Sequence, residues 1–297
     1  MSRATPAVAF AVATAGIAVF ASMDAVMKAQ SLLIGAYSAM LWRTVFGVAI
    51  SGSAFVLTRP RMPSVLEIRL HVARGTAAAI SVVLFFWGLT RVPMAQGVAL
   101  TFIAPLIALF LAGAVLREKV GKTAVVASLI AFAGVLVILL GQARAEMGPD
   151  AFRGSIAILV AAVLYAINLI LLRRQALAAK PIEIAFFTNL VFLGVYAVAA
   201  PWLAVWPAGD QWWWLAFAAV LATISILALA WAYAWAEASY LAPVEYTAFI
   251  WAAILGWLVF GETVQTLTIA GAALIVIGCA VAARRSPPPA PSVEAAM

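Results

Sequence analysis

The sequence predicts an all-α integral membrane protein with ten transmembrane helices arranged as two inverted five-helix repeats. Of its 297 residues, 67% are hydrophobic and 10% are charged, whereas about a quarter of the residues in soluble domains are charged. The hydrophobic residues form blocks of about 18 to 24, long enough to cross a ~30 Å hydrocarbon core as helices. The chain also resembles itself at a spacing of 144 residues. These three observations define the fold class.

The blocks follow one another with short connections that contain basic residues, proline or glycine, such as "RPRMP" and "RVP". No connection is long enough for a soluble domain, and the proline-rich end "RRSPPPAPSVEAAM" is typical of a disordered tail. The predicted spans are 6–27, 35–57, 71–90, 94–116, 122–141, 153–172, 182–205, 212–235, 242–260 and 265–283.

The distribution of basic residues predicts the orientation. If the N-terminus is cytoplasmic, most arginines and lysines outside the spans fall in cytoplasmic segments. The positive-inside rule therefore places both termini, including the tail 284–297, in the cytoplasm. Because the basic residues are scattered and form no stripe, a nucleic-acid partner is not expected. The bilayer and a small molecule are the expected partners.

The internal repeat aligns residues 99–120 with residues 243–264, so that Glu118 corresponds to Glu262. It divides the chain into a first repeat, 6–141, and a second repeat, 153–283. Since each contains five spans, an odd number, the second enters the membrane from the opposite side. Inverted repeats are typical of secondary transporters, in which two halves alternately expose a site near the midplane.

Several short motifs also resemble a known family. "DAVMK" in the first span, "LWR" in the second, and "LREK" and "FGET" after the fourth and ninth spans resemble the drug/metabolite transporter superfamily, EamA type. Within it, the chain is similar to bacterial aromatic amino acid exporters. The resemblance implies export of aromatic and other neutral amino acids across the inner membrane, without a cofactor. One departure is that Phe249 stands where Pro105 would have its repeat counterpart.

Polar residues inside spans are candidates for a substrate cavity, because polar side chains facing lipid are costly. Asp24 and Lys28 are four residues apart on one helix face, which favours either a self-neutralising pair or a gate. Arg43, next to Trp42, either holds a substrate carboxylate or bonds helix-end carbonyls. Thr188 and Asn189, both neutral, lie at the corresponding place in the second repeat.

The middle of the chain adds further candidates. Tyr165 and Asn168 share a helix face and bind either a substrate or a neighbouring helix. Phe85 and Trp87 offer stacking surfaces or simply pack. The remaining candidates flank predicted bends or helix starts: Gln96, Thr101, Glu245, Tyr246 and Trp251. His71 is expected to be an interfacial residue.

Other functions remain open at this stage. An acid with aromatic faces, as in Glu245, Tyr246 and Trp251, would suit a cationic substrate such as S-adenosylmethionine. An intramembrane enzyme is a distant alternative, because one histidine and no clustered carboxylates provide neither metal ligands nor a catalytic set. A receptor is equally distant. Neither the direction of transport nor a coupling ion is defined, and the expected state is a monomer or a dimer.

Overall fold

The computed structural model describes residues 6–58, 63–104, 106–108, 110–111, 122–144, 148–176, 181–235, 241 and 244–283. Pro105, Glu118 and the tail 284–297 therefore lie outside the described residues. The helices are α1 (Pro6–Ile34), α2 (Ala36–Leu57), α3 (Val65–Leu89), α4 (Met94–Thr101), α6 (Lys122–Arg144), α7 (Gly148–Ala176), α8 (Pro181–Leu203), α9 (Gln211–Trp235), α11 (Thr247–Phe260) and α12 (Thr266–Ala283).

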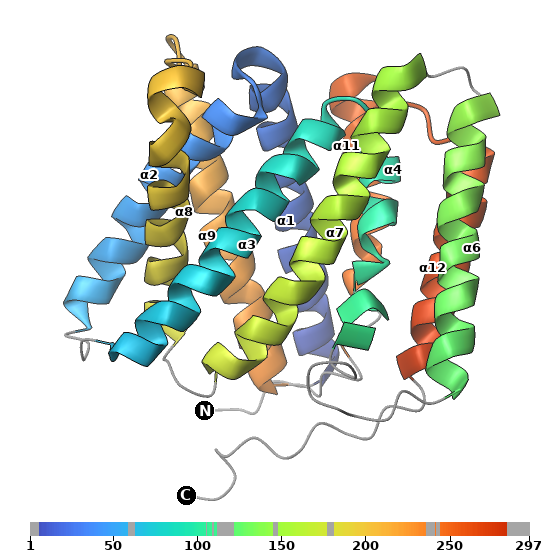
Figure 1. Cartoon of the computed structure of the whole chain (residues 1–297), viewed down its shortest axis with the longest axis horizontal. Coiled ribbons are helices and arrows are strands. Elements are labelled where there is room, and N and C mark those ends of the chain that lie inside the picture. The colour runs from blue at the N-terminus through green and yellow to red at the C-terminus, as the bar shows by residue number, and fades with distance from the viewer. Residues whose placement is uncertain are drawn as a thin grey trace, which may run out of the picture.

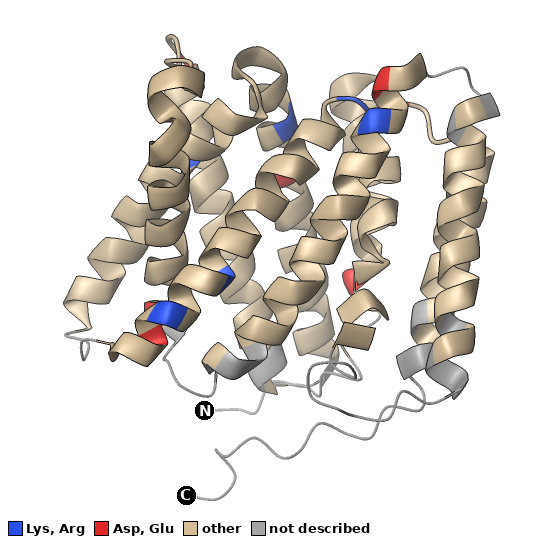
Figure 2. Cartoon of the chain, in the orientation of Figure 1, with Lys and Arg blue, Asp and Glu red and all other residues tan. Residues whose placement is uncertain are grey.

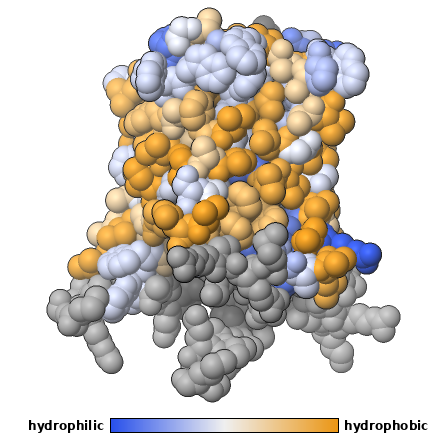
Figure 3. Space-filling view, turned by 90° about the vertical axis from the view of Figure 1, so that its left-hand side faces the viewer, coloured by the Kyte–Doolittle hydropathy of each residue, from blue (hydrophilic) through white to orange (hydrophobic). Residues whose placement is uncertain are grey.

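These helices stand side by side in one bundle (Figure 1). Each predicted span overlaps one of them, and in the described part of the chain six are long and apolar enough to cross a membrane. The crossing of α4, α6, α11 and α12 stays a prediction. In the space-filling view, hydrophobic residues cover the middle of one face, and less hydrophobic residues lie along its upper edge (Figure 3).

The chain begins α1 and ends α12 at the same end of the bundle, the lower end in Figure 1. We call this the terminal end and the opposite one the far end. α1 runs from the terminal end to the far end, whereas α7, which holds the matching place in the second half, runs the other way (Figure 1). Charged residues of the described part gather mainly toward the two ends (Figure 2).

Some helices are longer than the sequence predicts. α3 begins at Val65 because Ser64 and Glu67 form a capping box, in which each side chain binds the backbone N–H of the other residue. α1 continues to Ile34, past the predicted end at residue 27. Its later turns are rich in alanine, methionine and leucine, which favour helix. Consequently Arg74 and Lys28 lie well inside helices.

Matching contacts occur in the two halves. The most extensive packing joins α3 to α7, α1 to α9, α2 to α8 and α6 to α12. On α3, Ser81 Oγ donates to the carbonyl oxygen of Ala161 on α7 at 2.8 Å, and on α9 Ser225 Oγ donates to that of Gly16 on α1 at 2.9 Å. The two serines are 144 residues apart. The α3/α7 and α1/α9 crossings are therefore built alike.

Small residues allow the closest helix crossings. A Cβ on Gly134 of α6 would lie 2.6 Å from the carbonyl oxygen of Gly271 on α12, and a Cβ on Gly271 would lie 2.6 Å from that of Gly134. Such backbone contact is typical of membrane helix pairs. The α6/α12 crossing is thus reciprocal and requires glycine on both helices.

Candidate substrate-binding site

The half of the bundle next to the far end, called the far half, contains a pair of opposite charges, of which Asp24 is buried and Arg43 is half-buried. Asp24 on α1 and Arg43 on α2 interact electrostatically, yet no direct ion pair joins them among the described residues. The Nε atom of Arg43 is buried and has no hydrogen-bond partner. Tyr196 on α8 also interacts with Arg43, and its hydroxyl donates to the carbonyl oxygen of Ala79 at 2.9 Å. Both charges thus keep binding capacity that protein groups do not fully use.

Lys28 has a different partner from the one its spacing suggests. Its ammonium forms an ion pair with Glu262, in the connection after α11, and donates to the carbonyl oxygen of Val92 at 3.0 Å. The second carboxylate oxygen of Glu262 accepts from the backbone N–H of Met94 at 2.7 Å. Gly261, with φ 66°, ends α11 in the left-handed conformation that glycine favours. Glu262 therefore ties α1 to the start of α4 at the far end.

The half of the bundle next to the terminal end, called the terminal half, contains a buried arginine with neutral partners. Arg74 on α3 donates from Nη1 to Oδ1 of Asn168 on α7 at 3.2 Å, and from Nη2 to the hydroxyl of Thr188 on α8. Its Nε is buried and unpartnered. No described carboxylate forms an ion pair with it. The sequence placed Arg74 near the end of a span, so its isolation inside the bundle was not foreseen.

His71 lies one turn away on α3 and is buried among the helices, with only 1% of it exposed. Its Nε2 is 3.2 Å from Oε1 of Glu183 on α8, and its Nδ1 contacts the amide of Gln175 on α7. The ring stacks on Phe187 at a centroid distance of 4.6 Å. Its predicted place at the membrane interface stays a prediction, because burial between helices does not define depth in the membrane.

Two helices are interrupted at matching places. α4 ends at Thr101 and helix resumes at Ala104, whereas Val244 and Glu245 are helical and α11 begins at Thr247 after a turn at Tyr246. The residues at the interruptions, Phe102 and Tyr246, are 144 apart and their rings meet edge to face at 5.4 Å. Breaks of this kind line substrate sites in many transporters. Glu245 therefore lies at the end of the helical segment before this turn and not in α11.

Glu245 is exposed and interacts electrostatically with Tyr165 on α7. Tyr165 is 46% exposed, whereas Asn168, one turn further along the same helix face, is buried. The structure therefore brings together three sequence candidates, Glu245, Tyr165 and Asn168, with Arg74 at the buried end. Thr101 is less involved, since its hydroxyl donates to its own helix at the carbonyl oxygen of Val98.

Other predicted candidates are held by protein contacts. Trp42 donates to the carbonyl oxygen of Val205 at 2.8 Å and packs on Trp206 and Trp212. Trp87 stacks under the guanidinium of Arg91, and the ring of Phe85 packs against that of Phe86. Asn189 binds Ser51, and Trp251 packs against a hydrophobic cluster that includes Ala13. These contacts support packing roles in this conformation.

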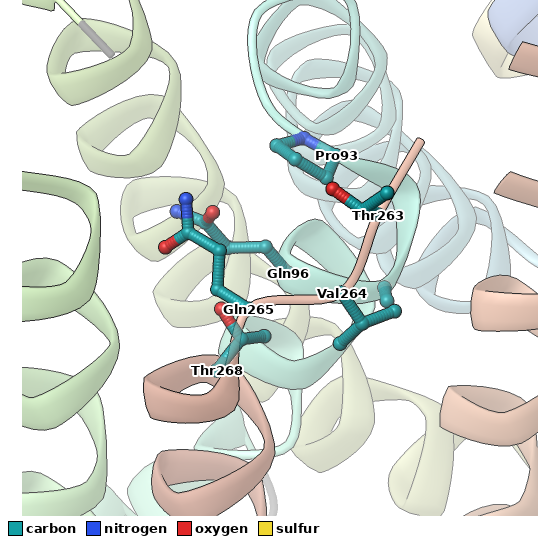
Figure 4. Close-up of a pocket in the computed structure, with 7 residues that line it drawn as sticks. Pro93, Gln96, Thr263, Val264, Gln265 and Thr268 are labelled. Carbon is teal, nitrogen blue, oxygen red and sulfur yellow. The ribbon is translucent and has the colours of Figure 1, made fainter. Parts of the chain in front are cut away.

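A small pocket lies beside the Lys28–Glu262 pair, between α4 and the connection from α11 to α12 (Figure 4). Pro93, Gln96, Thr263, Val264, Gln265 and Thr268 line it, together with Ala95. Its empty volume of about 170 Å³ includes open solvent. Gln96 donates to Ser155 on α7 at 3.4 Å. The pocket adjoins the Lys28–Glu262 ion pair and is too small for a substrate in this conformation.

Comparison with known proteins decides the family. The sequence profile of the EamA-like transporter family matches residues 7–140 and again residues 152–284. The chain belongs to the EamA-like transporter family. It is therefore a membrane transporter of small molecules and not an enzyme.

Curated relatives in this family differ in their substrates. A riboflavin transporter of Vibrio cholerae is 31% identical over 281 residues, covering 90% of this chain and 89% of that protein. The pseudopaline exporter CntI of Pseudomonas aeruginosa is 25% identical over 89% of this chain and 92% of its own. An S-adenosylmethionine uptake transporter of Rickettsia felis is 25% identical over 70% of this chain and 69% of its own. Family membership alone therefore does not identify the substrate.

A crystal structure aligns with 95% of this EamA-type chain and 100% of its own length, with a TM-score of 0.61 and 20% sequence identity. At this identity the likeness concerns the fold alone.

Proposed function

We propose that this chain is a secondary transporter that exports aromatic and other neutral amino acids across the bacterial inner membrane by alternating access. The observation that carries the proposal is the pair of Asp24 and Arg43, whose opposite charges interact without direct contact. An amino acid zwitterion has a carboxylate for the guanidinium fork of Arg43 and an ammonium for Asp24. Its net charge of zero leaves the balance of the site unchanged.

Alternating access is supported by the relation between the halves. The same family profile matches each half, α1 and α7 run in opposite directions (Figure 1), and Ser81 and Ser225 make matching contacts. We propose that residues 6–141 and 153–283 are inverted repeats that rock about the interrupted helices α4 and α11. The positive-inside rule favours a cytoplasmic terminal end. The Lys28–Glu262 pair then closes the outer side.

A second candidate substrate is riboflavin, which is favoured by the relative from Vibrio cholerae. It is aromatic and uncharged, and therefore compatible with Tyr165, Phe102 and Tyr246. S-adenosylmethionine is a third candidate, favoured by the Rickettsia felis relative and by the exposed acid Glu245 beside tyrosines.

Counterflow in liposomes tests the proposal. Purified protein is reconstituted with unlabelled phenylalanine inside, and uptake of labelled phenylalanine is measured against methionine, threonine, riboflavin and S-adenosylmethionine as competitors. We expect phenylalanine to accumulate and other neutral amino acids to compete. Competition by riboflavin or S-adenosylmethionine alone, with counterflow of that compound, would replace the amino acid assignment. Absence of counterflow for every compound would contradict transport of these substrates.

A further inference from the structure

We infer that Arg74, Asn168 and Thr188 form a binding position for the carboxylate of the substrate in the terminal half of the bundle. The inference rests on the proposed transport function and adds a second position: Arg74 and Arg43 hold the same carboxylate at different stages of transport. It names an anionic group as a requirement of the substrate.

Arg74 carries a positive charge that no acid among the described residues balances. The residue is 6% exposed, and Arg74 lies nine residues after the start of α3, about 13 Å along the helix. A charged group at this depth normally pairs with an opposite charge or marks a functional site. Arg74 instead binds the neutral acceptors Asn168 and Thr188, and its Nε has no partner. Among the described residues, its positive charge is not balanced by an ion pair.

The neighbouring acid is already engaged. On α3, His71 is one turn from Arg74, and it contacts Glu183 of α8 through Nε2. The side facing α7 offers Gln175 and Asn168, which carry no charge. The carboxylate of Glu183 thus serves His71, and Arg74 keeps its capacity for an anion.

The residues around Arg74 differ in charge from their counterparts in the far half. Asp24 and Asn168 are 144 residues apart, the spacing of the matching serines, and Thr188 lies next to Phe187, the counterpart of Arg43. The far half thus has an acid and an arginine, whereas the terminal half has two neutral residues around Arg74 at or beside the matching places. The far half carries its own anion. The terminal half lacks one, and the substrate carboxylate would supply it.

The side chains of Arg74, Asn168 and Thr188 suit a carboxylate. The guanidinium presents parallel N–H donors that match a carboxylate. The amide of Asn168 and the hydroxyl of Thr188 each accept from Arg74 now, but each can also donate after rotation. A singly charged carboxylate fits one arginine, whereas a phosphate dianion would favour several cations.

Thermal unfolding of the detergent-purified full-length protein tests this position, in chloride-free buffer. The probes are phenylalanine and phenylalanine amide, which differ in the carboxylate. We expect phenylalanine to raise the melting temperature and the amide to have at least tenfold weaker apparent affinity. Arg74→Gln should abolish the difference. Arg153→Gln is the matched control, because this exposed arginine is paired with Asp150 at the surface.

A second variant addresses the risk that Arg74→Gln fails to fold. Asn168→Asp places an acid beside Arg74 and makes the terminal half resemble the far half. We expect it to unfold at a higher temperature without ligand and to lose the preference for phenylalanine over its amide. A preference retained in both variants would overturn the inference, as would equal stabilisation of the wild type by both probes or a response to added chloride alone. Counterflow of riboflavin without any response to carboxylates would refute this position and the amino acid assignment while leaving transport intact. Counterflow of phenylalanine with an unchanged preference in Asn168→Asp would refute this position alone.

Discussion

The far and terminal halves of the bundle place polar groups at equivalent positions but balance charge differently. In the far half, Arg43 faces Asp24, and Lys28 is paired with Glu262. In the terminal half, Arg74 is surrounded by the neutral Asn168 and Thr188. A duplicated fold thus provides two similar frames, and differences in sequence between them give the arginine of one side an acid and leave the arginine of the other without one. The variants below change this difference, from the largest expected effect to the smallest.

Glu262→Gln should have the largest effect, because it leaves the buried ammonium of Lys28 without its counter-ion. Removing one partner of a buried ion pair typically costs about 3 to 5 kcal/mol. The backbone N–H of Met94 also loses a charged acceptor. We expect a clear fall in the melting temperature, measured by thermal unfolding in detergent.

The control for this variant is Asp150→Asn. Asp150 is paired with Arg153 at 3.1 Å, but these side chains are 75% and 69% exposed, and exposed pairs contribute about 0 to 1 kcal/mol. A melting temperature for Glu262→Gln that equals that of Asp150→Asn would show that the Lys28–Glu262 ion pair does not stabilise the folded protein.

Asp24→Asn should make the far half resemble the terminal half, with an arginine and no acid. The substrate ammonium loses a charged acceptor, and hydrogen bonds to charged groups contribute about 1.5 to 3 kcal/mol. We therefore expect kcat/KM for phenylalanine counterflow to fall about tenfold to a hundredfold, with the folded bundle retained by circular dichroism. Wild-type kinetics in this variant would remove Asp24 from the substrate site.

Glu245→Gln should have the smallest effect of the three. Glu245 is exposed and interacts electrostatically with Tyr165, and interactions of exposed charges are weak, so a loss of about 1 kcal/mol or less is expected. Counterflow should slow by up to about fivefold, mainly through a higher KM. An unchanged rate would leave Glu245 with only a role at the start of α11.

Much of the bundle is predictable from local sequence. Hydrophobic blocks, their connections and the spacing of 144 residues predict helices in the right order, since each signal spans one helix or compares two. Boundaries are harder, because α3 begins at Val65, six residues before the predicted span at 71. The pattern "SVLE" was a readable capping-box signal, and it places Arg74 inside the helix.

The site is less predictable because its contacts join distant segments. The spacing of Asp24 and Lys28 suggested a pair, but Lys28 meets Glu262, which is 234 residues away, and no local pattern encodes that contact. His71 is surrounded in sequence by arginines, yet α7 and α8 bury it. In contrast, the asymmetry in charge between Arg43 and its neutral counterpart could be read from the repeat alone. The repeat alone does not predict that Arg74 on α3 contacts Asn168 and Thr188.

The most direct test of the comparison between the halves is the ratio of initial counterflow rates for labelled phenylalanine and phenylalanine amide in liposomes. The account predicts that the wild type prefers the acid by about tenfold or more, and that Asn168→Asp brings the ratio close to one while Arg153→Gln leaves it unchanged. An equal preference for the acid in the wild type and in Asn168→Asp would contradict the claim that the terminal half takes its anion from the substrate.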